Sequence, residues 1–356
     1  MAGSKIERFI SSIPDGLDGV MILSPENRRY FTGFGSSDGI LLISPEKSVF
    51  FTDSRYTEAA FESVKDCDVA ELKRQESVLD MMRTLGMFNV GIETSYVTLR
   101  EYTRLKNTFE GVNFITDDET DRAILRQRMI KSEDELECIK RAQSIAEKSF
   151  EYILTYIRAG RTEREIQLEL DNCMLRNGAE ALSFETIAVG GKNSSRPHGC
   201  PTDYALKDGD LLTMDFGAVY NGYHSDMTRT VCIGRAGDDE REVYETVLSA
   251  QKAALNTICA GISCADGDAS ARDVIAGAGF GENFGHSLGH GVGIEIHEAP
   301  NLSPSSTMTL ESGMVVTVEP GIYLQGRFGV RIEDMVVVTD SGCENLTHAG
   351  KDLIEL

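Results

Sequence analysis

The chain has 356 residues, of which 41% are hydrophobic, and this is enough for roughly two globular domains. Acidic residues outnumber basic ones by 57 to 35, and the net charge of −22 argues against a nucleic-acid or anionic-membrane partner. The sequence has no apolar run long enough to span a membrane, no signal-peptide pattern and no dense cysteine framework, so we expect a cytoplasmic protein with reduced thiols.

Strands alternate with helices in the first third of the chain. The expected strands lie at 18–23 and 39–52, the helices at 56–65 and 76–86, and the turns at 24–27, 33–39 and 44–47. Such alternation is typical of a small α/β domain. The acidic stretch 117–121 interrupts the pattern, so we predict two domains, 1–124 and 125–356.

Helices and then strands follow in the second domain. Ser132 with Glu135 and Thr162 with Glu165 are capping-box patterns that precede amphipathic repeats. The expected helices run from these two boxes to Gly160 and to Asn177-Gly178, and again over 239–259 and 271–276. The chain after Gly285 is Gly-rich and strand-like. The pattern predicts helices packed on a largely antiparallel sheet.

The segment GDLLTMDFGAVYNGYHSDMTR, near the start of this sheet, predicts a β-hairpin because Asn221-Gly222 separates two apolar runs. With these two residues in the turn, Asp215 faces Thr228, and Asp215 and Asp226 project from the same face. Two like carboxylates on one face need a cation, a shared proton or bulk water. A solvated acidic face is the alternative to a metal site.

Further candidate ligands lie toward the C-terminus. The histidines of GHSLGHGVGIEIHE are His286, His290 and His297, and the surrounding glycines leave room for a ligand. Glu319 and Glu333 adjoin apolar runs, where an unpaired carboxylate is costly. Arg331 could form a structural salt bridge with one of them, but it cannot neutralise all four carboxylates.

Four carboxylates and one imidazole form a hard, oxygen-rich ligand set, which suits manganese, cobalt, iron or zinc. Their four negative charges balance two divalent cations. Two such ions a few Å apart can deprotonate a water molecule, and one carboxylate can then shuttle its proton. The set therefore indicates a hydrolase.

The motifs MDFG with SDMTRT, GHGVGIEIHE, VEPGIY and GVRIED resemble those of the pita-bread metallopeptidases, specifically the Xaa-Pro peptidases, over nearly all of 130–356. NRRYFTGF and TDSRY resemble the creatinase-type N-terminal domain of these enzymes. The resemblance implies an α/β (α+β) fold, with a small α/β N-terminal domain and a pita-bread catalytic domain whose curved, mainly antiparallel sheet is flanked by helices. It also implies two divalent metal ions, with manganese preferred over cobalt, zinc or iron, and a homodimer.

The same resemblance implies roles for individual residues. The metal ligands would be Asp215, Asp226, His290, Glu319 and Glu333, of which Asp226 and Glu333 would contact both ions. Glu319 would shuttle the proton, and His297 would steady the tetrahedral intermediate and the substrate carbonyl. His198, in SRPHG, would contact the scissile or proline region, with His286 and Arg331 also near the substrate.

The expected activity is hydrolysis of the Xaa-Pro bond at the N-terminus of dipeptides or short peptides. This bond has no N–H, so peptidases that bind that group lose a contact and a dedicated enzyme follows. A non-catalytic peptide-binding module and a metal-independent amidinohydrolase on the same fold are the alternatives. The sequence leaves open whether the enzyme is a dipeptidase (prolidase) or an aminopeptidase P.

Overall fold

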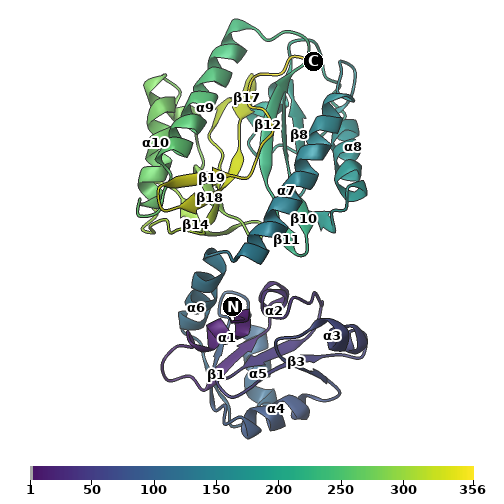
Figure 1. Cartoon of the computed structure of the whole chain (residues 1–356). Coiled ribbons are helices and arrows are strands. Elements are labelled where there is room, and N and C mark those ends of the chain that lie inside the picture. Colours follow the sequence, from purple (N-terminus) through teal and green to yellow (C-terminus); the bar gives the residue numbers. More distant parts are fainter. Residues whose placement is uncertain (1–2) are drawn as a thin grey trace. The chain divides into compact units, whose positions relative to one another are not determined.

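The chain forms two compact units. The computed structural model describes residues 3–356, and the first unit ends at Arg128 while the second comprises Met129–Leu356 (Figure 1). The division falls after residue 128, whereas the sequence places the domain boundary after residue 124.

The first unit is a mixed six-stranded sheet between two layers of helices. Its elements are α1 (Lys5–Ile10), β1 (Gly19–Ile22), α2 (Pro25–Thr32), β2 (Ile40–Ile43), β3 (Ser48–Thr52), α3 (Thr57–Ser63), β4 (Asp68–Glu71), α4 (Gln75–Thr84), β5 (Asn89–Ile92), α5 (Leu99–Thr108), β6 (Asn113–Ile115) and α6 (Glu119–Met129). The strand order is β4-β3-β2-β1-β5-β6. Helices α4 and α5 pack on one face, and α1, α2, α3 and α6 contribute to the core on the other. The expected small α/β domain is therefore confirmed.

Four helices of this unit differ from the prediction. The sequence predicts a turn at 24–27, but α2 begins there, with the Ser24 side chain accepting a hydrogen bond from the Asn27 N–H at 3.2 Å and Pro25 in the first turn. That prediction was wrong because Ser followed by Pro starts helices as readily as turns. Helices α1, α5 and α6 were not predicted, although α5 begins with a capping box formed by Thr98 and Glu101.

The second unit contains antiparallel sheets flanked by two pairs of helices (Figure 1). Its helices are α7 (Glu133–Leu154), α8 (Glu163–Arg176), α9 (Asp238–Thr257) and α10 (Cys264–Gly277), with the 3₁₀ turns η1 (Gly191–Ser195) and η2 (Gly281–Asn283). Its strands are β7 (Ala181–Leu182), β8 (Ile187–Gly190), β9 (Leu211–Phe216), β10 (Ala218–Tyr220), β11 (Tyr223–His224), β12 (Met227–Cys232), β13 (Gly289–Gly291), β14 (Glu298–Leu302), β15 (Val315–Val318), β16 (Gly321–Leu324), β17 (Phe328–Arg331), β18 (Asp334–Thr339) and β19 (Gly342–Asn345).

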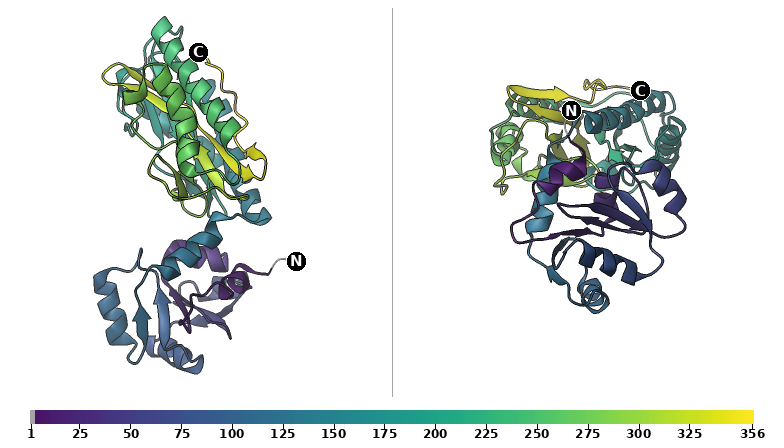
Figure 2. Two further views of the ribbon diagram at one scale, coloured as in Figure 1. Left: turned by 90° about the vertical axis from the view of Figure 1, so that its left-hand side faces the viewer. Right: turned by 60° about the horizontal axis from the view of Figure 1, so that its bottom comes forward.

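Helices α7 and α8 begin where their capping boxes predict. Both capping boxes form at α7 and α8, and these helices pack on strands β9 and β12 around one hydrophobic core. Helices α9 and α10 lie side by side (Figure 2). Helix α10 is longer than the expected 271–276 because its start is set by the Ser263 cap. No helix within residues 3–356 combines the length and apolarity needed to cross a membrane.

The hairpin has the predicted register. Asn221 and Gly222 both have positive φ, 48° and 81°, as a two-residue hairpin turn of this sequence requires. Asp215 pairs with Thr228, as expected. The hairpin is interrupted near Asp226, however, so that β10 and β11 belong to one sheet and β9 and β12 to another.

The interruption lies where the two strands approach closely. A Cβ added at Gly217 would lie 1.8 Å from the Ser225 carbonyl oxygen, so only glycine fits there. Beyond this point β9 continues with Leu212, Met214 and Phe216 facing the core, which leaves Asp215 on the opposite face. The break therefore separates the turn from β9, which carries Asp215, and Asp226 lies at the break itself, directly before β12.

Candidate metal centre

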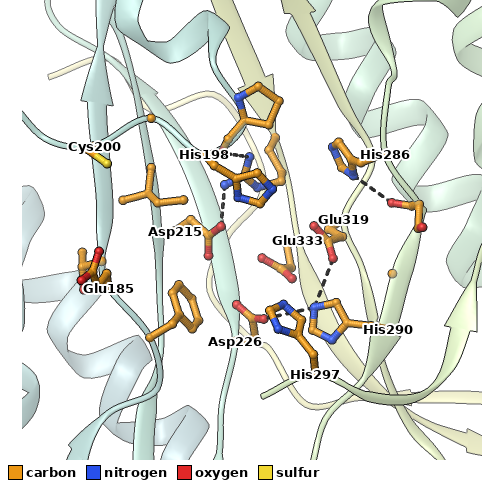
Figure 3. A pocket seen from close by; sticks show the side chains of 18 of the residues that line it. Glu185, His198, Cys200, Asp215, Asp226, His286, His290, His297, Glu319 and Glu333 are labelled. Atoms are coloured by element: carbon orange, nitrogen blue, oxygen red, sulfur yellow. Dashed lines mark hydrogen bonds and ion pairs between the residues drawn. The ribbon is translucent and has the colours of Figure 1, made fainter. Parts of the chain in front are cut away.

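One cavity of about 900 Å³ in the second unit brings the predicted site residues together. Every residue singled out from the sequence lines it, namely His198, Asp215, Asp226, His286, His290, His297, Glu319, Arg331 and Glu333 (Figure 3). The carboxylates therefore do not form a solvated acidic face, which was the alternative for the hairpin.

The five proposed ligands come from five places in the sheets. Asp215 lies in β9 and His290 in β13, while Asp226 and Glu333 directly precede β12 and β18, and Glu319 directly follows β15. The ends of the strands thus supply three of the four carboxylates, where the backbone is free to turn the side chain inward. Figure 3 shows these side chains pointing toward one another from opposite walls.

The ligand atoms lie close together. The Nε2 atom of His290 is 3.6 Å from Oδ2 of Asp226 and 3.4 Å from Oε1 of Glu319. One ligand atom each from Asp226, His290 and Glu333 all lie within 4.8 Å of one another. This spacing allows one ion to contact all three.

Burial makes this cluster unfavourable for negative charge alone. It raises the pKa of Asp226 well above its usual range, and the neighbouring Glu333 and Asp215 charges raise it further. Burial likewise raises the pKa of Glu333, with Glu319 and Asp215 adding to the effect. Partial burial of Glu319, whose side chain is 17% exposed, raises its pKa to about 8. A bound cation would relieve the repulsion among these groups.

Individual atoms also fit a metal ion. Oδ1 of Asp215 and Oδ1 of Asp226 are buried and have no hydrogen-bond partner among the described residues. Nδ1 of His290 lies 3.1 Å from the Gly291 carbonyl oxygen, which accepts its proton and leaves the Nε2 lone pair toward the cluster. Buried oxygens without partners and an oriented imidazole are the donors that a hard divalent cation requires.

Arg331 pairs with an aspartate and not with either glutamate. Its Nη2 lies 2.5 Å from Oδ2 of Asp215, and its side chain is 4% exposed. Its Nε donates to the Thr228 hydroxyl at 3.0 Å, and that hydroxyl donates to Oε2 of Glu333 at 2.7 Å. The salt bridge with a glutamate that was considered from the sequence is therefore not the one that forms, and Arg331 instead pairs with Asp215, another member of the carboxylate cluster.

Tyr323, to which the sequence assigns no role, contacts two residues that line the cavity. The Tyr323 hydroxyl accepts a hydrogen bond from Arg331 at 2.7 Å and lies 3.0 Å from Nε2 of His286. Burial and the nearby Arg331 charge lower the pKa of His286 to about 4, so its imidazole is neutral at neutral pH. The only sequence signal for Tyr323 is its place at the end of VEPGIY.

The two remaining histidines differ in their surroundings. The ring centre of His297 lies 4.4 Å from that of His290, and burial lowers the pKa of His297. His198 is exposed at the cavity wall and makes no hydrogen bond within residues 3–356. In the view of Figure 3 the cluster lies between these two histidines.

This fold and this site define a metal-dependent hydrolase, and comparison with known proteins identifies the family. Residues 137–340 match the metallopeptidase family M24, and residues 14–130 match the creatinase/prolidase N-terminal domain. The chain belongs to metallopeptidase family M24. Membership implies divalent metal ions, in agreement with the carboxylate and histidine cluster.

Relatives and solved structures cover nearly the whole chain. It is 41% identical to the uncharacterized peptidase YqhT of Bacillus subtilis, over 96% of each chain, and 35% identical to an Xaa-Pro dipeptidase of Pyrococcus furiosus, over 98% of this chain and 99% of that one. An Xaa-Pro dipeptidase from Bacillus anthracis superposes with a TM-score of 0.94 at 40% identity, covering 99% of both chains. An X-Pro aminopeptidase from Thermotoga maritima gives 0.93 at 38% identity, covering 99% of this chain and 100% of that one. These likenesses confirm the expected fold, with a pita-bread second unit.

Proposed function

We propose that this chain is an Xaa-Pro peptidase, which uses two divalent metal ions to hydrolyse the bond between an N-terminal residue and proline in dipeptides or short peptides. The observation that carries the proposal is the cluster of buried carboxylates around His290, with unpaired oxygens on Asp215 and Asp226. The printed names of relatives, an Xaa-Pro dipeptidase and an X-Pro aminopeptidase, support this substrate class. They give no support to a binding module or an amidinohydrolase.

The ligands in this proposal are Asp215, Asp226, His290, Glu319 and Glu333. Their four negative charges balance two divalent cations, and the hard oxygen set favours manganese, with cobalt, zinc and iron as further candidates. When bound, such ions polarise a carbonyl group and lower the pKa of a water molecule. Asp226 and Glu333 would contact both ions, consistent with their burial at the centre of the cluster.

Glu319 is the proposed proton carrier. Its Oε1 accepts a hydrogen bond from the Thr317 hydroxyl at 3.1 Å, which fixes the orientation of the carboxyl group. A carboxylate in this position can take a proton from the attacking water molecule and give it to the proline nitrogen as the C–N bond breaks. Proline nitrogen must be protonated to leave as a secondary amine, so this transfer is required for turnover.

The histidines act on the substrate in this proposal. His297 has a lowered pKa, so its neutral imidazole offers one N–H to the oxygen of the scissile carbonyl as negative charge develops there. His198, exposed on the wall, would contact the proline region. His286 and Arg331 would lie next to the bound substrate, and Arg331 also forms an ion pair with Asp215.

A matched substrate panel tests the function. An Xaa-Pro dipeptide, an Xaa-Pro-Yaa tripeptide and an Xaa-Ala control would each be assayed with added Mn²⁺ and again after chelation. We expect metal-dependent cleavage of the proline substrates and none of the Xaa-Ala control. Faster dipeptide cleavage would define a prolidase, faster tripeptide cleavage an aminopeptidase P, and no metal-dependent cleavage would refute the function.

Assembly and location form a further part of the proposal. The eight cysteines are scattered along the sequence and form no dense disulfide framework, which favours a reducing compartment and hence the cytoplasm. The homodimer rests on the resemblance to Xaa-Pro peptidases alone. Light scattering of the purified protein, with a mass of twice 39.1 kDa expected, tests it.

A further inference from the structure

A buried glutamate outside the metal cluster contacts the segment that carries His198. Glu163 is the first residue of α8, directly after the Thr162 cap, and its side chain is fully buried. None of the proposed metal ligands contacts it. No lysine or arginine forms an ion pair with it within residues 3–356, so its charge is compensated by hydrogen bonds alone.

The carboxylate of Glu163 accepts hydrogen bonds from three separate parts of the chain. Oε1 accepts from the Gly190 N–H at 2.7 Å and from the Asn193 side-chain amide at 3.0 Å. Oε2 accepts from the Thr202 N–H at 2.9 Å, from the Thr202 hydroxyl at 2.6 Å and from the same Asn193 amide at 3.2 Å. One carboxylate thus joins the end of β8, the η1 turn and the chain beyond His198.

These contacts close a loop. Asn193 precedes His198 and Thr202 follows it, and both ends of this segment bind the same carboxylate. The backbone of α8 adds to the closure, because the Arg164 N–H donates to the Thr202 carbonyl at 3.1 Å. His198 makes no hydrogen bond to any residue that the structure describes, so its position depends on the backbone of the segment that Glu163 closes.

The segment also reaches the metal cluster at its middle. The Pro197 carbonyl accepts a hydrogen bond from Arg331 at 3.3 Å, and Arg331 binds Asp215. His198, the next residue, therefore lies between a point fixed to the cluster and an end fixed to Glu163. His198 is exposed and forms no side-chain hydrogen bond among the described residues. Its position at the cavity wall therefore depends on both of these backbone attachments.

We propose that Glu163 is a positioning residue, which closes the 193–202 segment and thereby holds His198 against the substrate. The inference rests on the proposed function, because it assigns Glu163 an effect on substrate through His198. Loss of a buried carboxylate's bonds leaves its former donors unsatisfied and frees the segment. A displacement of about 1 Å at a substrate-contacting group is enough to reduce turnover about 100-fold.

The test compares two substitutions on the same helical turn. Glu163→Gln replaces one acceptor oxygen by an amide that cannot accept, whereas Glu165→Gln alters the exposed capping box, where the carboxylate accepts from the Thr162 N–H at 2.9 Å. We expect Glu163→Gln to lower kcat/KM for an Xaa-Pro substrate about 10- to 100-fold, and Glu165→Gln to leave it within about threefold. Bound metal per chain should equal that of the unaltered protein in both.

A double-mutant cycle with His198→Ala separates positioning from general destabilisation. If Glu163 acts through His198, Glu163→Gln should have almost no further effect on kcat/KM in the His198→Ala background. Effects that multiply would overturn the inference. Thr202→Val removes one hydroxyl donor and serves as a milder second variant. We expect it to lower kcat/KM less than Glu163→Gln does, and to have almost no effect in the His198→Ala background.

Amide hydrogen exchange measures how well the backbone of the 193–202 segment is protected, independently of catalysis. The backbone N–H groups of the 196–202 segment, which its two prolines lack, should exchange faster in Glu163→Gln than in Glu165→Gln, and equal exchange would contradict the inference. The proposed peptidase function and the proposed role of Glu163 can be refuted separately. Absence of metal-dependent Xaa-Pro cleavage by the unaltered chain refutes the function, whereas normal cleavage with multiplying effects refutes only the role of Glu163.

Discussion

Thr228 links the arginine and the glutamate of the metal cluster, so its hydroxyl should tune metal affinity. The side chain is fully buried, donates to Oε2 of Glu333 at 2.7 Å and accepts from Nε of Arg331 at 3.0 Å. Thr228→Val keeps the shape of the side chain and removes both hydrogen bonds. Glu333 would then bind metal without its orienting partner.

The expected loss follows from these two contacts. A hydrogen bond to a charged group contributes about 1.5–3 kcal/mol, and outer partners of metal ligands typically change metal affinity 10- to 100-fold. We therefore expect Thr228→Val to weaken Mn²⁺ binding 10- to 100-fold, which corresponds to about 1.4–2.8 kcal/mol. The unfolding free energy of the metal-free protein should fall by about 1–3 kcal/mol.

Thr230→Val is the matched control. Thr230 lies on the same face of β12, is equally buried, and its hydroxyl donates to the Arg331 carbonyl at 3.0 Å without touching a proposed ligand. Titration calorimetry with Mn²⁺ would measure both variants, and urea unfolding with chelator would measure their stability. Equal metal affinities in Thr228→Val and Thr230→Val, at similar losses of stability, would refute the reasoning.

Three further predictions concern the cluster and its support. Glu319→Ala should lower kcat at least about 1,000-fold, because it removes the proposed proton carrier together with a proposed metal ligand, and near-normal turnover would exclude this role. In metal-free protein the raised pKa of Glu319 makes its stabilising contribution complete below 4.5 and lost as pH rises through about 8. Calorimetry with chelator should therefore show Tm falling over this range, less steeply in Glu319→Gln, and an unchanged slope in that variant would contradict the assignment. Arg229→Met breaks a buried ion pair in which Nη2 lies 2.8 Å from Oδ1 of Asp334, and should cost about 3–5 kcal/mol of unfolding free energy. A loss below about 1 kcal/mol in urea unfolding would show that the other partners of Asp334 compensate.

Local signals in the sequence were sufficient for the elements that carry the aspartates. Asn221-Gly222 requires positive φ at both positions, and this requirement sets the register that pairs Asp215 with Thr228. The capping boxes at the starts of α7 and α8 formed as predicted because each satisfies its own backbone donors within four residues. Such features depend on neighbours in sequence and need no distant partner.

Other elements could not be assigned from local signals. Ser24-Pro25 is locally compatible with a helix start and with a turn, and in the folded chain it begins helix α2, where the Ser24 N–H also donates to the buried carboxylate of Glu93 at 3.0 Å. The interruption of the hairpin at Gly217 likewise depends on how closely Ser225 approaches. In both cases the deciding contact involves the three-dimensional packing of the strands or helices around the segment.

The same division applies to the site. The kinds of ligand could be predicted before any fold was known, because four carboxylates and a histidine beside apolar runs are costly without a cation, and the resemblance of their motifs located them. The fold was needed to show that Arg331 pairs with Asp215, that Thr228 joins Arg331 to Glu333, and that Glu163 closes the segment of His198. These pairings join residues tens of positions apart or more, and hydrogen-bond geometry is specific only once packing has brought both partners within about 3 Å.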